Sequence, residues 1–234
     1  MSLNKYISDT GICSRREADK WIEAGRVKIN NKIAKKGNRV FQGDQVTVDG
    51  KPLKAKPKLV YIALHKPVGI TCTTDRTDKD NIIDFVNYPL RIFPIGRLDK
   101  DSSGLILLTN DGDIVNLILR EENEHEKEYI VKIDRPVTQE FVEGMRNGVR
   151  LVGLNVVTKK CYVAKLTKYK FKIVLTQGLN RQIRRMSRQL FRRVVRLKRV
   201  RIMNIRLGNL REGEWRELTD RELRDLKRSL NYFK

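Results

Sequence analysis

The sequence predicts an α+β protein, in which a small mixed unit precedes a larger domain built on a mainly antiparallel sheet. Three observations carry this prediction. Residues 1–50 combine two short amphipathic helical patterns with alternating segments, and residues 51–58 are rich in lysine and contain two prolines. From residue 59 onward, compact apolar runs of strand length alternate with turn signals and a few helical patterns. We therefore predict a domain at 1–50, a linker at 51–58 and a second domain at 59–234.

Apolar spacing and capping signals define the elements of the small unit. A first helix places Leu3 and Ile7 on one face, and a second begins at Ser14, which with Glu17 predicts a capping box. Asn30-Asn31 then separates two alternating segments, the pattern of a β-hairpin.

The larger domain contains runs typical of buried strands, separated by Gly, Asn and Asp. A capping box at Thr219 and Glu222 predicts the final helix. Strands are predicted at 59–64, 104–109, 127–133, 149–153, 159–166, 169–176 and 199–207, and helices at 114–120, 138–148 and 181–191.

Charge is the strongest signal in the composition. There are 50 Lys and Arg against 28 Asp and Glu, for a net charge of +22. No carboxylate side chain occurs between Glu143 and Glu212, where twenty Lys and Arg fall. A field of one sign over that length indicates an anionic partner, and nucleic acid is the first candidate. The alternative is a solubilising surface.

The cysteines and the apolar runs bear on metal sites and location. Cys13, Cys72 and Cys161 are far apart and there are only two histidines, so we expect reduced thiols and no zinc site. No apolar run approaches the length of a membrane span, and the first residues do not resemble a signal peptide. We expect a cytoplasmic protein with no membrane segment.

The stretch GRLDKDSSG, residues 96–104, is a glycine-bounded loop followed directly by an apolar run. A strand behind such a loop would hold a reactive carboxylate rigidly. Composition alone does not separate Asp99 from Asp101, and a solvated turn would explain both. A third interpretation is a magnesium nuclease, with Asp99 and Asp101 or Asp111 and Asp113 as ligands.

Further along the chain, QGLNRQIRRM brings several arginines to the start of a helix. A guanidinium there could pair with a carboxylate and keep it ionised. Plain phosphate binding is the alternative.

Together these stretches resemble a known family. HKPVG, GRLDKDSSGLILLTNDG, HEKEY and GLNRQIRRM, in this order, are similar to motifs of the RsuA/RluB/RluE/RluF group of pseudouridine synthases. LNKYISDTGICSRREADKWIEAG, FPIGRLDKDSSGLI and TKKC resemble the RluF-type enzymes in particular. The N-terminal unit resembles the alpha-L RNA-binding domain first seen in a ribosomal protein. The resemblance covers nearly the whole chain.

The resemblance implies a role for particular residues. Asp99 matches the essential aspartate, Tyr129 the tyrosine under the uracil ring, and Arg184 the arginine that pairs with the aspartate. The residues implied in substrate binding or in shaping the cleft are Arg97, Leu98, Lys66, Pro67, Gly69, Arg181, Gln182 and Arg185. The basic residues expected to bind RNA from the N-terminal domain are Arg15, Arg16, Lys20, Arg26 and Lys28.

The implied reaction is isomerisation of uridine to pseudouridine in large-subunit (23S) ribosomal RNA, by a monomer. Nothing is oxidised and no phosphate is transferred, so no cofactor and no metal are expected. Attack on the sugar and removal of a sugar proton are both open as the role of Asp99. Two departures from the family are Ser102, where threonine is frequent, and Arg192, where glycine is expected. The rival interpretation is a non-catalytic RNA-binding protein associated with the ribosome.

Overall fold

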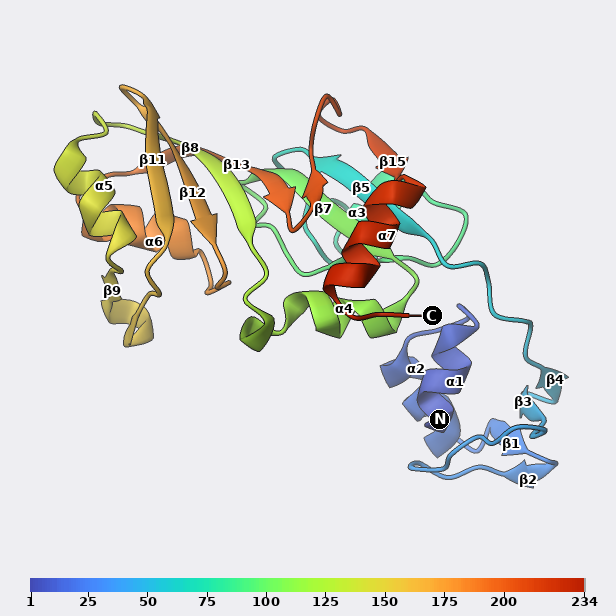
Figure 1. Ribbon diagram of the computed structural model, residues 1–234. Helices are drawn as coiled ribbons and strands as arrows, with labels where there is room; N and C mark the ends of the chain where they lie inside the picture. Colours follow the sequence, from blue (N-terminus) through green and yellow to red (C-terminus); the bar gives the residue numbers. More distant parts are fainter. Residues whose placement is uncertain (234) are drawn as a thin grey trace. The chain divides into compact units, whose positions relative to one another are not determined.

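The computed structural model describes residues 1–233, and these residues form two compact units. The first unit comprises Met1–Val60 with two short segments, Tyr88–Ile92 and Asn110–Gly112. The second comprises Tyr61–Asn87, Phe93–Thr109 and the chain from Asp113 onward. Figure 1 shows the elements of both units in chain order.

The first unit packs two helices on a small antiparallel sheet. Its strands run in the order β2-β1-β3-β4. The elements are α1 (Leu3–Asp9), α2 (Arg15–Glu23), β1 (Val27–Ile29), β2 (Lys32–Ile33), β3 (Val46–Val48) and β4 (Lys51–Pro52). Its core contains Leu3, Ile7, Ala18, Ile22 and Val27, all of them buried.

Local signals in this unit act largely as predicted. The hairpin between β1 and β2 is confirmed, because Ile29 pairs with Lys32 and both intervening asparagines have positive φ, 50° and 66°. At α2, the Ser14 hydroxyl accepts a hydrogen bond from the Glu17 backbone N–H at 3.1 Å. That bond is one half of the predicted capping box.

A mixed sheet forms the second unit. In the described residues it has nine strands, of which β7 (Ser103–Thr109) and β13 (Val194–Ile202) are parallel and the other pairs are antiparallel. The main order is β11-β12-β8-β13-β7-β5-β15, with β14 beside β13 and β6 beside β7. The other strands are β5 (Tyr61–Lys66), β6 (Phe93–Ile95), β8 (Lys127–Ile133), β11 (Tyr162–Thr167), β12 (Lys170–Leu175), β14 (Ile205–Arg206) and β15 (Trp215–Glu217).

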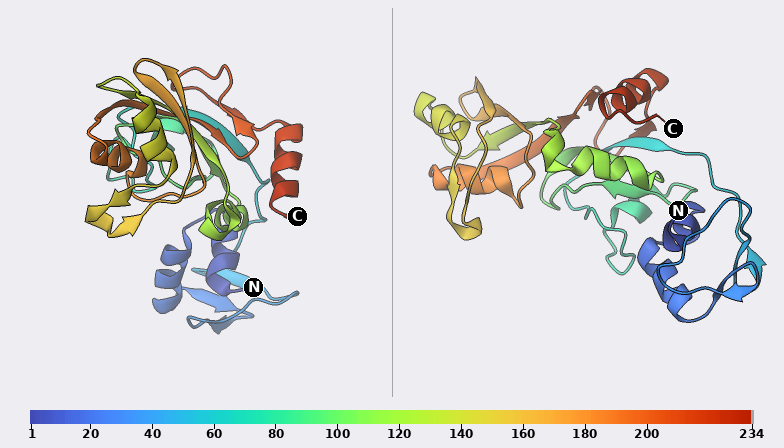
Figure 2. Two further views of the ribbon diagram at one scale, coloured as in Figure 1. Left: turned by 60° about the vertical axis from the view of Figure 1, so that its left-hand side comes forward. Right: turned by 60° about the horizontal axis from the view of Figure 1, so that its bottom comes forward.

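Helices cover the sheet at both ends. In Figures 1 and 2, α5 (Gln139–Arg146) and α6 (Gln182–Gln189) lie at one end of the second unit, and α7 (Asp220–Ser229) lies at the other. A cluster of buried residues joins α4 (Gly112–Leu119) and α7 to the central strands. All seven residues of β7 are buried, which makes it the rigid centre of the unit. The remaining elements are α3 (Ile82–Val86), η1 (Glu121–Asn123), β9 (Arg150–Leu151), η2 (Val152–Leu154) and β10 (Val156–Val157).

Two strand predictions are wrong in their extent. The predicted strand 199–207 is a hairpin of β13 and β14, which turns at Met203 with φ 51°. The predicted strand 149–153 is only β9, and a 3₁₀ turn follows it. No helix in residues 1–233 is long and apolar enough to cross a membrane.

Candidate active site

The glycine-bounded loop lies between two adjacent strands. It leaves β6 at Ile95 and enters β7 at Ser103. Inside the loop, the Ser102 backbone N–H donates to the Asp99 carbonyl at 3.0 Å, which closes a tight turn. The Asp99 side chain is 33% exposed, so its carboxylate stays accessible while the buried strand behind it fixes the backbone.

The segment after β5 braces this loop from behind. The Lys66 ammonium is fully buried and donates to the carbonyls of Pro67 and Ile70, at 2.7 and 2.8 Å. The Gly69 N–H donates to the Lys100 carbonyl at 2.8 Å, and the Cys72 Sγ accepts from the Leu98 N–H at 3.4 Å. Burial lowers the pKa of Lys66 and raises that of Cys72. These contacts hold the backbone on both sides of Asp99.

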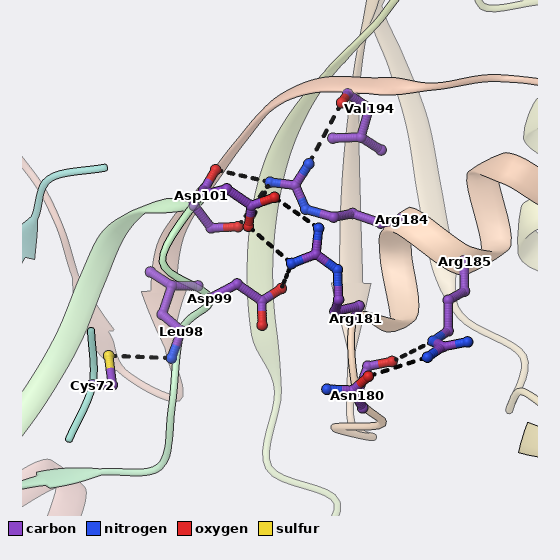
Figure 3. A network of polar contacts seen from close by, with 10 residues as sticks. Cys72, Leu98, Asp99, Asp101, Asn180, Arg181, Arg184, Arg185 and Val194 are labelled. Atoms are coloured by element: carbon purple, nitrogen blue, oxygen red, sulfur yellow. Dashed lines mark hydrogen bonds and ion pairs between the residues drawn. The ribbon is translucent and has the colours of Figure 1, made fainter. Parts of the chain in front are cut away.

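Two arginines at the start of α6 meet the carboxylates of the loop (Figure 3). Arg181 binds Asp101 with two hydrogen bonds, of 3.1 and 2.7 Å, and its Nη1 lies 3.6 Å from the Asp99 carboxylate. Arg184 donates to the Asp101 carbonyl at 2.9 Å and to the Ser102 hydroxyl at 3.0 Å. The bonds from Arg181 lower the pKa of Asp101, and burial lowers the pKa of Arg184.

This arrangement corrects the pairing expected for Asp99. The ion pair that the structure gives Asp99 is with Arg181, whereas Arg184 contacts Asp101 and Ser102. The two arginines are only three residues apart in the sequence, one just before α6 and one in its first turn, so their spacing alone does not decide which one reaches Asp99. Arg181 adopts the left-handed region, with φ 51°, at the residue before α6. The Ser102 hydroxyl, which stands where the family often has threonine, is used by Arg184.

A cavity of about 410 Å³ opens beside Asp99. Tyr129 on β8 lines it and is buried, as are Leu98 and Leu175. A cavity of this size, with apolar walls and a few converging charged groups, fits a small planar ligand such as a nucleobase. The cavity thus brings together seven of the predicted site residues, namely Arg97, Leu98, Asp99, Tyr129, Arg181, Gln182 and Arg184.

Arg199 is a cavity residue that the sequence prediction missed. It is 4% exposed, donates from Nε to the Leu105 carbonyl at 2.7 Å, and lies 6.0 Å from the Tyr129 ring centroid. Its Nη2 is buried without a hydrogen-bond partner. Arg199 belongs to an alternating basic run, and the shift in β8–β13 register between Arg199 and Arg201 would not be visible in that pattern.

Some of the remaining predicted residues support the walls of the cavity, and the others lie on the surface outside it. Lys66 is fully buried and bonds the Pro67 carbonyl, so it supports the wall of the cleft rather than lining the cavity. Gln182 lines the cavity, but its amide is bonded to Gln177 and to the Leu179 N–H. Pro67 and Gly69 lie in the bracing turn.

Arg185 and the N-terminal basic residues lie outside this cavity. Arg185 folds back onto Asn180, donating to its backbone carbonyl at 3.0 Å. In the first unit, Arg26 forms two hydrogen bonds to Asp49, at 2.9 and 2.6 Å. The predicted RNA-binding residues of that unit are all exposed, namely Arg15, Arg16, Lys20, Arg26 and Lys28. Across residues 1–233, no group of three or more His, Cys, Asp and Glu side chains is placed to hold a metal ion.

Comparison with known proteins defines the class. Residues 60–189 match the family model described as RNA pseudouridylate synthase, and residues 1–46 match the S4 domain. A solved pseudouridylate synthase matches 97% of this chain and 99% of its own, with a TM-score of 0.71 and 32% sequence identity. The chain belongs to the RNA pseudouridine synthase family and carries an N-terminal S4 domain.

Comparison with individual relatives shows which members of that family this chain is similar to. The chain is 58% identical over 199 residues to the dual-specificity RNA pseudouridine synthase RluF of Salmonella typhi, an alignment that covers 84% of this chain and 68% of that protein. It is 36% identical over 204 residues to the ribosomal large subunit pseudouridine synthase B of Bacillus subtilis, covering 84% and 83%. The protein is therefore an RluF-type synthase that isomerises uridine in RNA to pseudouridine. The predicted fold class and family are confirmed.

Proposed function

We propose that this enzyme modifies large-subunit (23S) ribosomal RNA and that Asp99 supplies the reacting carboxylate. The observation that carries the proposal is the placement of Asp99, an accessible carboxylate on a braced loop, at a cavity shared with Tyr129 and Arg181. The 36% identity to a synthase named for the ribosomal large subunit supports the choice of RNA.

The reaction explains why such a cavity is needed. The bond between the sugar and the uracil nitrogen breaks, the base turns, and a new bond forms to ring carbon five, which releases its proton while the freed nitrogen takes one up. Attack on the sugar and removal of a sugar proton both require an ionised carboxylate beside the flipped-out nucleotide. Arg181 provides a positive charge for that carboxylate, and Tyr129 provides an apolar face for the base. Flipping the base costs a few kcal/mol, which phosphate contacts offset.

Tritium release identifies the RNA substrate. Large-subunit ribosomal RNA, small-subunit ribosomal RNA and transfer RNA would each be transcribed with label on uracil carbon five and incubated with the enzyme. We expect release from the large-subunit RNA at least tenfold faster than from the small-subunit RNA. Release from transfer RNA alone would overturn the proposed substrate while leaving the isomerase intact.

Arg181→Ala is expected to lower the single-turnover rate by about 100-fold, because the loop carboxylates lose the guanidinium that fixes them. Arg181→Lys should recover only part of that rate, since one ammonium cannot replace two parallel N–H donors. Arg76→Ala is the matched control, an exposed arginine 3.6 Å from one carboxylate and outside the cavity. Rates for Arg181→Ala equal to those of the control would contradict the role given to Arg181.

Basic residues on α2 are expected to add RNA affinity without touching the chemistry. Arg16 and Lys20 are exposed and four residues apart, hence on one helix face. Replacing both by Gln should flatten the dependence of log Kd on log salt by about 1.4 to 1.8, at 0.7 to 0.9 per phosphate contact. Lys36→Gln, which removes a lysine already paired with Glu23 at 2.8 Å, serves as the control. An unchanged salt slope in the double variant would remove this face from the RNA interface.

A non-catalytic ribosome-associated role is disfavoured by the joint placement of Asp99, Tyr129 and Arg181 at one cavity.

The linker at 51–58, the cytoplasmic location and the monomeric state stay predictions.

A further inference from the structure

A second, larger hollow lies beside the catalytic cavity, along α6 and the residues that follow it. Its volume is about 730 Å³. Arg181 and Arg184 line both hollows, so the two adjoin at these side chains. We call this second hollow the arginine groove. Besides Arg181 and Arg184, the residues that line it are Asp134, Arg185, Arg188, Phe191, Arg192, Arg193 and Val194.

Charge in the arginine groove is strongly one-sided. Six of its nine residues are arginines, and a single carboxylate, that of Asp134, lines it with them. Asp134 accepts from the Arg193 N–H at 2.8 Å, and its carboxylate lies 3.9 Å from the Arg193 Nε. Crowded guanidinium groups repel one another unless an anion joins them, and phosphate oxygens match their planar donor geometry.

Phe191 is the unusual member of the groove. It ends α6 in a Schellman motif, with its own N–H bonded to the Arg188 carbonyl at 3.0 Å and the Arg192 N–H bonded to the Ser187 carbonyl at 2.9 Å. Its φ is 59°, in the left-handed region, and its side chain is 80% exposed. Our expectation from the family pattern placed the glycine-like position at Arg192, and the structure places it one residue earlier.

Two other helices of this chain end in the same way and use residues suited to that conformation. After α2 the left-handed residue is Gly25, and after α7 it is Asn231, with φ of 70° and 49°. Glycine and asparagine adopt positive φ readily, whereas a bulky aromatic residue rarely does. Phe191 therefore combines an unfavourable backbone conformation with a large exposed apolar surface. Local strain of this kind is concentrated at functional sites.

We propose that the arginine groove binds an unpaired RNA segment flanking the target uridine, and that one base of that segment stacks on Phe191. This inference rests on the proposed function and extends it to a second contact site. The arginines would hold the phosphates while the ring offers a face to the base, the combination typical of single-strand binding. Because Arg181 and Arg184 line both cavities, a strand that leaves the catalytic cavity past these side chains would reach the groove next.

Phe191→Gly tests the stacking contact, because glycine suits the backbone and removes only the ring. We expect affinity for a 12-nucleotide oligouridylate to fall about tenfold, the effect of losing one stacked base. Affinity for an abasic ribose-phosphate oligomer of equal length should change less than twofold. The melting temperature should rise, since glycine relieves the strain. Phe233→Gly is the matched control, because Phe233 is 82% exposed and does not line the groove.

Phe191→Trp gives a direct readout of contact. Its added fluorescence should be quenched by oligouridylate and not by the abasic oligomer. Three results would each overturn the inference. The first is equal quenching by the two oligomers, and the second is an equal loss of affinity for both in Phe191→Gly. The third is binding of oligoglutamate as tight as that of oligouridylate. Tritium release by the wild type on large-subunit RNA separates the two proposals: its absence, with base-dependent quenching intact, removes the proposed function alone.

Discussion

Asp99→Asn is expected to abolish pseudouridine formation, with a loss of roughly a thousandfold or more in the single-turnover rate, while RNA affinity stays within about twofold. The amide has the size of the carboxylate but neither its charge nor its nucleophilicity, so both routes at the sugar are blocked. The Asp99 side chain is partly exposed, which leaves the fold little affected by the change. Single-turnover tritium release and filter binding on the same RNA measure the two quantities.

Asp101→Asn is the control that separates the two loop carboxylates. Asp101 is bound through two hydrogen bonds by Arg181 and serves to position it, so a loss of about tenfold is expected. A variant at Asp99 that turns over faster than the variant at Asp101 would move the chemistry to Asp101.

Gly104→Ala is expected to destabilise the protein by about 3–5 kcal/mol, or to prevent folding. Gly104 pairs with Arg199 across the parallel β7–β13 contact, and its φ is +114°. A Cβ there would overlap the Arg199 carbonyl oxygen and lie 2.5 Å from the Arg199 nitrogen. Backbone atoms in a sheet cannot move aside as a side chain would. Urea unfolding of the purified variant measures the loss.

Gly213→Ala supplies the control for backbone strain alone. Its φ is +90°, yet an added Cβ would meet only the Phe85 ring, at an ordinary 3.7 Å. We expect a loss of about 1–2 kcal/mol from the conformation itself. Similar losses in the two variants would show that the close approach of β7 to Arg199 contributes nothing.

The braced loop that carries Asp99 could be predicted because its signals are local. Glycine-bounded acidic residues followed by an apolar run mark a loop braced by a buried strand, and Asp99 lies on such a loop. The hairpin at Asn30 and Asn31 was predictable for the same reason, since both residues favour positive φ.

Features decided by tertiary contacts could not be predicted in the same way. Arg199 is one of several arginines in β13, and its place in the cavity wall depends on how β13 pairs with its neighbouring strands. The break at Met203 carries no glycine or proline, so the apolar pattern runs through the turn. Arg181 and Arg184 have equivalent sequence signals, and the geometry at the start of α6 assigns Asp99 to Arg181.

The end of α6 shows how accurately a sequence pattern can locate a particular residue at a helix end. The family pattern correctly indicated an unusual residue near the end of this helix, but placed it at Arg192 rather than at Phe191. Helix ends are uncertain by one or two residues when only side-chain patterns are available. Here a shift of one residue changes how the helix end is interpreted. The left-handed position is occupied by the aromatic residue Phe191 beside the active site, and not by the surface residue Arg192.

Tritium release in EDTA tests the central claim most directly. Large-subunit ribosomal RNA labelled on uracil carbon five would be incubated with the wild type and with Asp99→Ala side by side. The account predicts release by the wild type alone, undiminished by the chelator, because the carboxylate on the braced loop performs the chemistry without a metal. Release by Asp99→Ala at the wild-type rate would contradict the account.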